Sequence, residues 1–172
     1  MKLVVLLLLI FSSWSTNEVT VEKHPNLLFY IERNLNHNTV IYEANFDENG
    51  QLHKRMPIKA HWIMFEKNGE SEQLNYAEQR MAYGVKCTAD KKAAHNYRVK
   101  LVADESREFT LEQTAPFKAQ ITTAIKGEQV QLTRLYIQAD NSSFWPAIDY
   151  VLLEGKDLKT DSILSEKVRP EK

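Results

Sequence analysis

The sequence has little of what several specialised protein classes depend on. Its 172 residues contain one cysteine, five glycines and five prolines, and 22 lysines and arginines nearly balance 23 aspartates and glutamates. A single cysteine excludes an intramolecular disulfide, and the low glycine and proline content excludes collagen-like chains. The formal net charge of −1 argues against a nucleic-acid binder that works through a general basic field.

Familiar catalytic and metal-binding motifs are also missing. The chain has no glycine-rich phosphate loop, no cysteine pair at metal spacing, no His-Glu-x-x-His sequence and no Gly-x-Ser-x-Gly elbow. The histidines are scattered without His-x-His spacing, at His24, His37, His53, His61 and His95. We therefore predict no metal site and no cofactor, and these absences favour a role other than catalysis without deciding the question.

A short apolar segment opens the chain. After Met1 and Lys2, the run from Leu3 to Phe11 is apolar throughout and is followed by small polar residues. As a helix this run rises about 13 Å, at roughly 1.5 Å per residue, and falls short of a hydrocarbon core about 30 Å thick. It predicts a secretion signal over residues 1–15 and an exported protein, periplasmic or secreted. The alternative is a short uncleaved signal anchor, and no later segment is apolar enough to be a transmembrane anchor.

The remaining chain predicts one folded domain. A hydrophobic content of 43% with 26% charged residues is typical of a globular protein. No repeat or composition break marks a second domain, so residues 16–155 are expected to form a single β-rich domain. The charged segment 156–172 is expected to be a flexible C-terminal tail.

Alternation of apolar and polar residues dominates this domain. It is clearest in 97–104 and 117–126, where every second residue is apolar, as a strand with one solvated face requires. One helical pattern interrupts it near residues 71–82, with Ser71 as a candidate cap and Gly84 as a candidate left-handed end. The prediction is a mainly β fold, an antiparallel β-sandwich or barrel of about nine strands with one short helix. The expected core is Phe29, Ile31, Val40, Tyr42, Trp62, Val99, Leu101, Phe109, Ile121 and Leu132.

Cys87 falls on the same face of an expected strand as Val85. We interpret it as a buried, structural thiol, because no sequence feature brings a histidine to it.

One polar constellation could carry function. If the first two strands close as a hairpin at Asn36 and His37, Tyr30 lies near Glu43 and Glu32 lies near Ile41, on one face. His61 joins them if the third strand pairs in a suitable register. The candidate ligand-binding residues are Tyr30, Glu32, Arg33, Glu43, Asn45, His61, Arg80 and Tyr83. The alternative is the solvated face of a surface hairpin, and no residue is assigned a catalytic role.

Several segments of the sequence resemble those of a known family. They run over 26–34, 38–45, 57–63 and 80–85, and the likeness extends over residues 24 to 155. The chain resembles the exported bacterial proteins grouped as domain of unknown function family 4833. The resemblance implies an exported bacterial location and a single domain, and it carries no established activity.

Three functions follow as hypotheses. The first is a binding module for a small polar or amphipathic ligand. The second is a cell-envelope protein-protein interaction domain that uses exposed strand edges or the aromatic loop 143–146. The third is a hydrolase whose acid and base are drawn from Glu32, Glu43 and His61.

Overall fold

The structure is a computed structural model that describes residues 21, 24–91, 93, 95–140 and 147–169. The predicted signal over residues 1–15 and the aromatic loop 143–146 lie outside these residues. Eleven strands form one sheet, accompanied by a 3-10 helix, η2 (Phe65–Lys67), and one α-helix, α1 (Tyr76–Met81). The strands are β1 (Leu27–Arg33), β2 (Asn36–Ala44), β3 (Ile58–Met64), β4 (Glu70–Gln73), β5 (Val85–Ala89), β6 (Asn96–Leu101), β7 (Phe109–Ala115), β8 (Lys118–Ile125), β9 (Glu128–Asp140), β10 (Ala147–Asp157) and β11 (Ile163–Val168). Within the described part of the chain, no helix has the length and apolar character needed to cross a bilayer.

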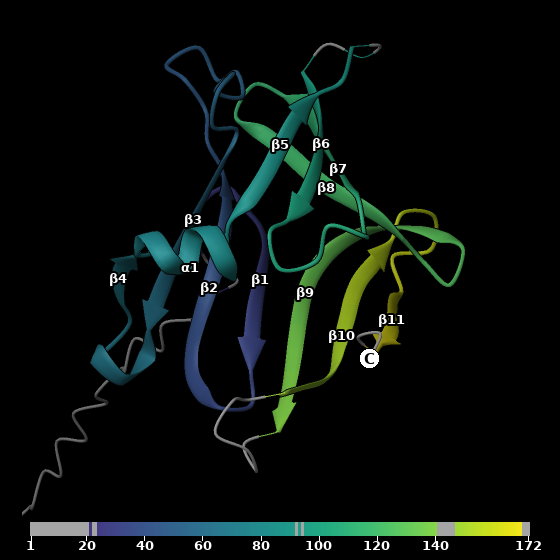
Figure 1. The fold of residues 1–172 in the computed structure, drawn as a ribbon. Coiled ribbons are helices and arrows are strands. Elements are labelled where there is room, and N and C mark those ends of the chain that lie inside the picture. The colour runs from purple at the N-terminus through teal and green to yellow at the C-terminus, as the bar shows by residue number, and fades with distance from the viewer. Residues whose placement is uncertain (1–20, 22–23, 92, 94, 141–146, 170–172) are drawn as a thin grey trace, which may run out of the picture.

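The long strand β9 organises the sheet. Its first half pairs with β8 through residues such as Val130 and Gln131, and its second half pairs with β1 along the same edge. Two four-stranded arms therefore leave β9 in different directions (Figure 1): the first arm is β1-β2-β3-β4 and the second arm is β8-β7-β6-β5. β10 covers the other edge of β9, and β11 pairs with β10. The result is a curled, half-barrel sheet.

The predicted fold class is confirmed. Two features of the sheet were not predicted from the local sequence pattern. The sheet has eleven strands, and the β1–β9 pairing is parallel, whereas the other strand pairings are antiparallel. Arg33 lies opposite Ile137 in this parallel pair, more than a hundred positions along the chain. Alternation marks a strand and its buried face but does not identify so distant a partner.

The core lies between the two arms. Phe29 of β1 stacks on Tyr42 of β2 with ring centroids 4.2 Å apart, and Phe109 of the second arm lies 6.4 Å from Phe29. The predicted core is buried except at Leu101, which is partly buried and packs against the same cluster. Each large apolar side chain fully buried here stabilises the fold by about 1.5–3 kcal/mol. The apolar residues at every second position are therefore the ones whose burial stabilises the sheet.

The helix is shorter than predicted and begins at a different cap. Asn75 accepts a hydrogen bond from the Glu78 amide while the Glu78 carboxylate accepts one from the Asn75 amide, which is a capping box. Ser71 lies in β4, opposite Ile63 of β3. Gly84 does not have a positive φ; a Cβ there would instead lie 1.8 Å from the carbonyl oxygen of Gln79. The predictions for Ser71 and Gly84 were therefore wrong, because the capping box and the β3–β4 pairing set the boundaries.

The prediction of a flexible tail from residue 156 was also wrong for the described part of that segment. β10 runs to Asp157, and β11 pairs with it from Ile163 to Val168. The Asp157 carboxylate accepts backbone hydrogen bonds from Lys159 and Thr160, which closes the turn. Charge alone suggested a solvated segment, yet one edge of β10 supplies backbone partners that a charged strand can use.

Candidate functional site

The eight predicted site residues fall into separate places because the β1–β2 register differs from the predicted one. Tyr30 lies opposite Ile41, and Leu27 lies opposite Glu43. The pairing has irregularities between Leu27 and Phe29 and between Ile31 and Arg33. Such irregularities shift the facing residues and re-aim side chains. The hairpin turn lies at Asn34 and Leu35, with Arg33 opposite Asn36, and not at the predicted Asn36 and His37. The predicted register, with Tyr30 beside Glu43 and Glu32 beside Ile41, was therefore wrong.

The first of these places is centred on Arg33. Its Nε donates to the Asn36 side chain at 3.2 Å, and one terminal nitrogen donates to the Tyr83 hydroxyl at 2.8 Å. The guanidinium carbon lies 5.0 Å from the Trp62 ring centroid and 5.8 Å from that of Tyr83. Both distances are within the range of cation–π attraction. The structure thus brings together Arg33 and Tyr83, two of the predicted residues that are 50 positions apart in the chain.

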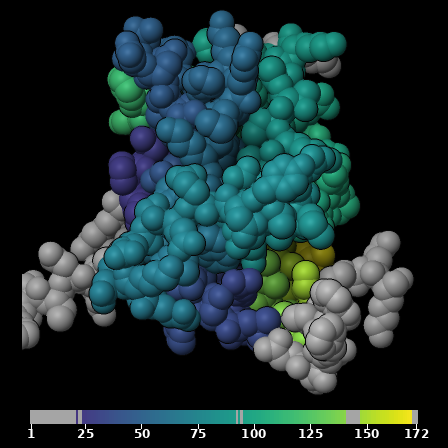
Figure 2. All heavy atoms as spheres, turned by 60° about the vertical axis from the view of Figure 1, so that its left-hand side comes forward, coloured from purple at the N-terminus to yellow at the C-terminus, as the bar shows by residue number. Residues whose placement is uncertain are grey.

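A cleft of about 220 Å³ opens beside this arginine. Its lining comes from β1, β2, β3, β4 and the start of α1, on the side of the molecule turned forward in Figure 2. We call it the Arg33 cleft. It is lined by Arg33, Asn36, Asn38, Trp62, Met64, Glu72, Gln73, Asn75 and Glu78.

The charges around the Arg33 cleft are unequally compensated. Glu72 pairs with Lys67 at 3.0 Å, and Glu78 is engaged in the capping box at the start of α1. Arg33 forms no ion pair with a carboxylate in the described part of the chain. Burial raises the pKa of Tyr83, with Arg33 acting in the opposite direction, so its hydroxyl stays protonated. A cation held by two aromatic rings therefore faces the cleft without an acidic partner.

Glu43 and His61 meet in a second place, on the outer face of the first arm. His61 Nδ1 lies 3.9 Å from one Glu43 oxygen, and Nδ1 of His24 lies 3.8 Å from the other. The two imidazole rings are 6.4 Å apart in an edge arrangement. Burial lowers the pKa of His61, with Glu43 opposing this effect and His24 and Lys59 adding to it. Sequence reasoning missed His24, which precedes the first strand.

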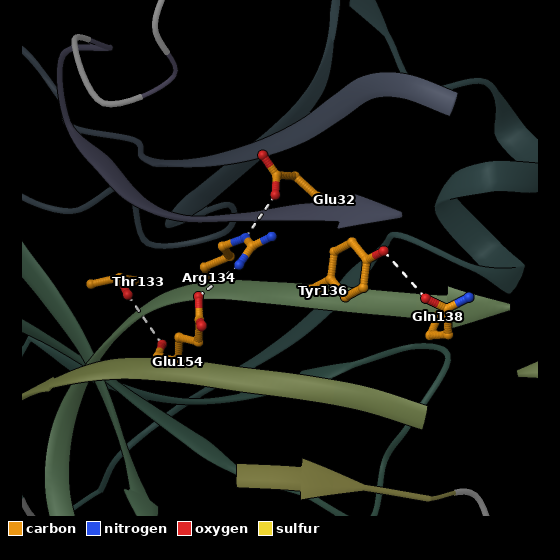
Figure 3. A network of polar contacts seen from close by, with 6 residues as sticks. All are labelled: Glu32, Thr133, Arg134, Tyr136, Gln138 and Glu154. Carbon is orange, nitrogen blue, oxygen red and sulfur yellow. Dashed lines mark hydrogen bonds and ion pairs between the residues drawn. The ribbon is translucent and has the colours of Figure 1, made fainter. Parts of the chain in front are cut away.

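Glu32 belongs to a third place, an ion-pair network on β1, β9 and β10 (Figure 3). Arg134 donates from Nε to Glu32 at 2.6 Å and from a terminal nitrogen to Glu154 at 2.8 Å. The Tyr136 ring lies 5.1 Å from the Arg134 guanidinium carbon. Burial lowers the pKa of Arg134, but the hydrogen bonds that it donates to both carboxylates outweigh this effect, and the net pKa is raised. This network gives the Glu32 carboxylate a hydrogen-bond donor, and it links β1 to β9 beside their parallel pairing.

The remaining predicted residues have local roles. Asn45 is buried and donates from its side chain to the Met56 carbonyl at 2.7 Å, which supports the loop between β2 and β3. Arg80 is exposed and lies over the Tyr76 ring on α1, with the guanidinium carbon 5.4 Å from its centroid. Tyr30 packs beside the outer apolar cluster that contains Ile41 and Ile63. None of these three lines the Arg33 cleft.

Sequence reasoning missed several residues of these places. Trp62 was assigned to the core and is buried, but its ring also makes a cation–π contact with the Arg33 guanidinium. Asn36 was expected in the turn of the first hairpin and lies instead at the start of β2. Arg134 interrupts the alternation of its strand, which was the available signal that both faces of β9 are covered.

Comparison with known proteins gives one family. The profile of the family described as Domain of unknown function (DUF4833) matches residues 29–167. The chain therefore belongs to this family. No curated protein and no solved structure matches it.

Proposed function

We propose that this member of the DUF4833 family is a binding module that takes a small polar ligand, through an anionic group, into the Arg33 cleft. The observation that carries the proposal is the state of the Arg33 side chain. A guanidinium has five N–H donors, and contacts with Asn36 and Tyr83 use two nitrogens of this one. Its charge has no carboxylate partner among the described residues.

The chemistry of the cleft supports a carboxylate or phosphate group. The guanidinium lies within cation–π distance of Trp62 and Tyr83. Its N–H donors form a planar fork, which matches the oxygens of these anions. The amides of Asn36, Asn38 and Gln73 line the same cleft and offer further polar contacts. A volume of about 220 Å³ is below the range of roughly 300–1,000 Å³ for drug-sized ligands. The ligand is therefore small.

Two other hypotheses have less support. Glu32 lies opposite Tyr136, whereas Glu43 lies opposite Leu27. Five residues of strand span about 16 Å at roughly 3.3 Å each, so the two carboxylates do not share one acid–base site. The aromatic loop of the interaction hypothesis lies outside the described residues. We also propose that binding takes place outside the cytoplasm, which the apolar run from Leu3 to Phe11 supports.

Native mass spectrometry of the protein purified from its own source tests the binding proposal. We expect a small retained molecule in the wild type and its loss in Arg33→Met. Arg80→Met is the matched control, because Arg80 is exposed on α1 and lies outside the cleft. Titration with acetate and with inorganic phosphate, followed by NMR at the Trp62 indole, gives a second measurement. The proposal fails if neither anion perturbs that signal and nothing is retained, or if both variants behave alike.

A further inference from the structure

Three metal-ligating side chains converge on the outer face of the first arm, away from the Arg33 cleft. His61 lies opposite Ile41 in the β2–β3 pairing, and its neighbour Trp62 lies opposite Val40. Because side chains alternate along a strand, His61 and Glu43 point away from the core that Trp62 and Val40 enter. The segment before β1 brings His24 to the same spot. The ligand atoms of His24, Glu43 and His61 all lie within 4.8 Å of one another.

The spacing of these atoms differs from that of a direct hydrogen-bonded pair. The two Nδ1–carboxylate distances are 3.8 and 3.9 Å, longer than the 2.7–3.2 Å usual for N–H···O bonds. Each histidine nitrogen faces a different oxygen of the same carboxylate. Four ligands about 2.0–2.1 Å from one zinc ion lie roughly 3.4 Å from each other. A shift of about half an ångström brings each histidine nitrogen to that distance from its carboxylate oxygen, and the three ligand atoms, which lie within 4.8 Å of one another, close in by up to about 1.4 Å around one ion.

The surroundings suit a partly open site. The side chains of His24, Glu43 and His61 are 24%, 18% and 12% exposed, so solvent can occupy a further coordination position. An apolar cluster of Val21, Ile41 and Ile63 lies on the same face and lowers the local dielectric constant. Lys59 lies opposite Glu43 in the β2–β3 strand pair.

We propose that His24, Glu43 and His61 bind a divalent transition-metal ion, with Zn²⁺ as the best match. Two imidazole nitrogens and one carboxylate are a ligand set that zinc takes in open, four-coordinate sites. The sequence lacks a spacing motif for this site because its ligands come from three separate elements. The site is independent of the proposed ligand cleft.

Calorimetric titration of the metal-free full chain with Zn²⁺ tests the proposal, together with the visible absorption of the Co²⁺-loaded protein. We expect one Zn²⁺ per chain and a tetrahedral Co²⁺ spectrum. Glu43→Gln and His61→Gln should each weaken Zn²⁺ binding at least about tenfold, the scale on which supporting residues alone act. His37→Gln is the matched control, since His37 is an exposed histidine on the neighbouring part of β2.

Circular dichroism of each variant shows that a loss of binding is not a loss of fold. The proposal is overturned if the folded wild type does not bind Zn²⁺, or if folded Glu43→Gln and His61→Gln bind it as tightly as His37→Gln does. Arg33→Met should keep its Zn²⁺ affinity, so failure of this site and failure of the ligand cleft are separate results.

Discussion

The buried hydroxyl of Tyr42 donates a 2.8 Å hydrogen bond to the backbone carbonyl oxygen of Tyr83. This bond joins the C-terminal part of β2 to the link between α1 and β5. Complete burial raises the pKa of Tyr42 well above its ordinary value, so the hydroxyl remains a donor at physiological pH. The same contact places the Tyr83 ring beside Arg33, where its own hydroxyl accepts a hydrogen bond.

Tyr42→Phe should therefore destabilise the protein by about 1–3 kcal/mol, because it leaves a part-buried carbonyl without its donor. Equilibrium urea unfolding measures this change. Tyr76→Phe is the control, since the Tyr76 side chain is 73% exposed, and a surface change of this kind stays within about 0.5 kcal/mol. Equal effects of the two substitutions would contradict the assigned role of the Tyr42 hydroxyl.

Gly84→Ala should be among the most damaging single substitutions in the chain. The added Cβ would meet the Gln79 carbonyl oxygen at 1.8 Å, and backbone cannot swing aside as a side chain does. We expect a loss of about 3 kcal/mol or more by thermal or urea unfolding. Gly127→Ala has open space around its Cβ but a φ of +86°, so it should cost only about 1–2 kcal/mol. A smaller loss at Gly84 than at Gly127 would count against the close approach described here.

Cys87 should react slowly in the native state. The thiol is partly buried, and not fully buried as interpreted from the sequence. This burial raises its pKa from 9.0 to about 11, so at pH 8 the reactive thiolate is about 100-fold scarcer than in the unfolded chain. Labelling with a water-soluble disulfide reagent should accelerate about tenfold per pH unit between pH 8 and 10 and rise sharply in urea. Native labelling as fast as labelling of the unfolded chain would refute a structural thiol.

Arg134→Met should destabilise the junction of β1, β9 and β10. The substitution keeps much of the apolar stem but leaves the part-buried carboxylates of Glu32 and Glu154 without their shared donor. We expect a loss of about 1–3 kcal/mol in urea unfolding, as for charged hydrogen bonds elsewhere. Lys67→Met removes a more exposed ion pair with Glu72 and should have little effect. If Arg134→Met behaves like Lys67→Met, the network is not what fastens the parallel pair.

Local sequence pattern was sufficient to predict most of the strands and their buried faces. Val99 and Phe109 alternate with polar residues, and both are buried in the structure. Alternation works here because successive side chains of a strand point to opposite faces, and burial of one face stabilises the fold. The same reasoning could not find β4, in which every residue is exposed.

The candidate sites depended on tertiary structure. By itself the sequence determined a mainly β domain, its core and the polar residue types available to a ligand. Only the folded chain decided which of them meet: the β1–β2 register places Glu43 opposite Leu27 and away from Glu32, α1 and β5 bring Tyr83 to Arg33, and the segment before β1 brings His24 to His61. The physical reason is that the face of a residue follows from its neighbours in the chain, whereas register and strand partner are chosen by packing between segments far apart in it.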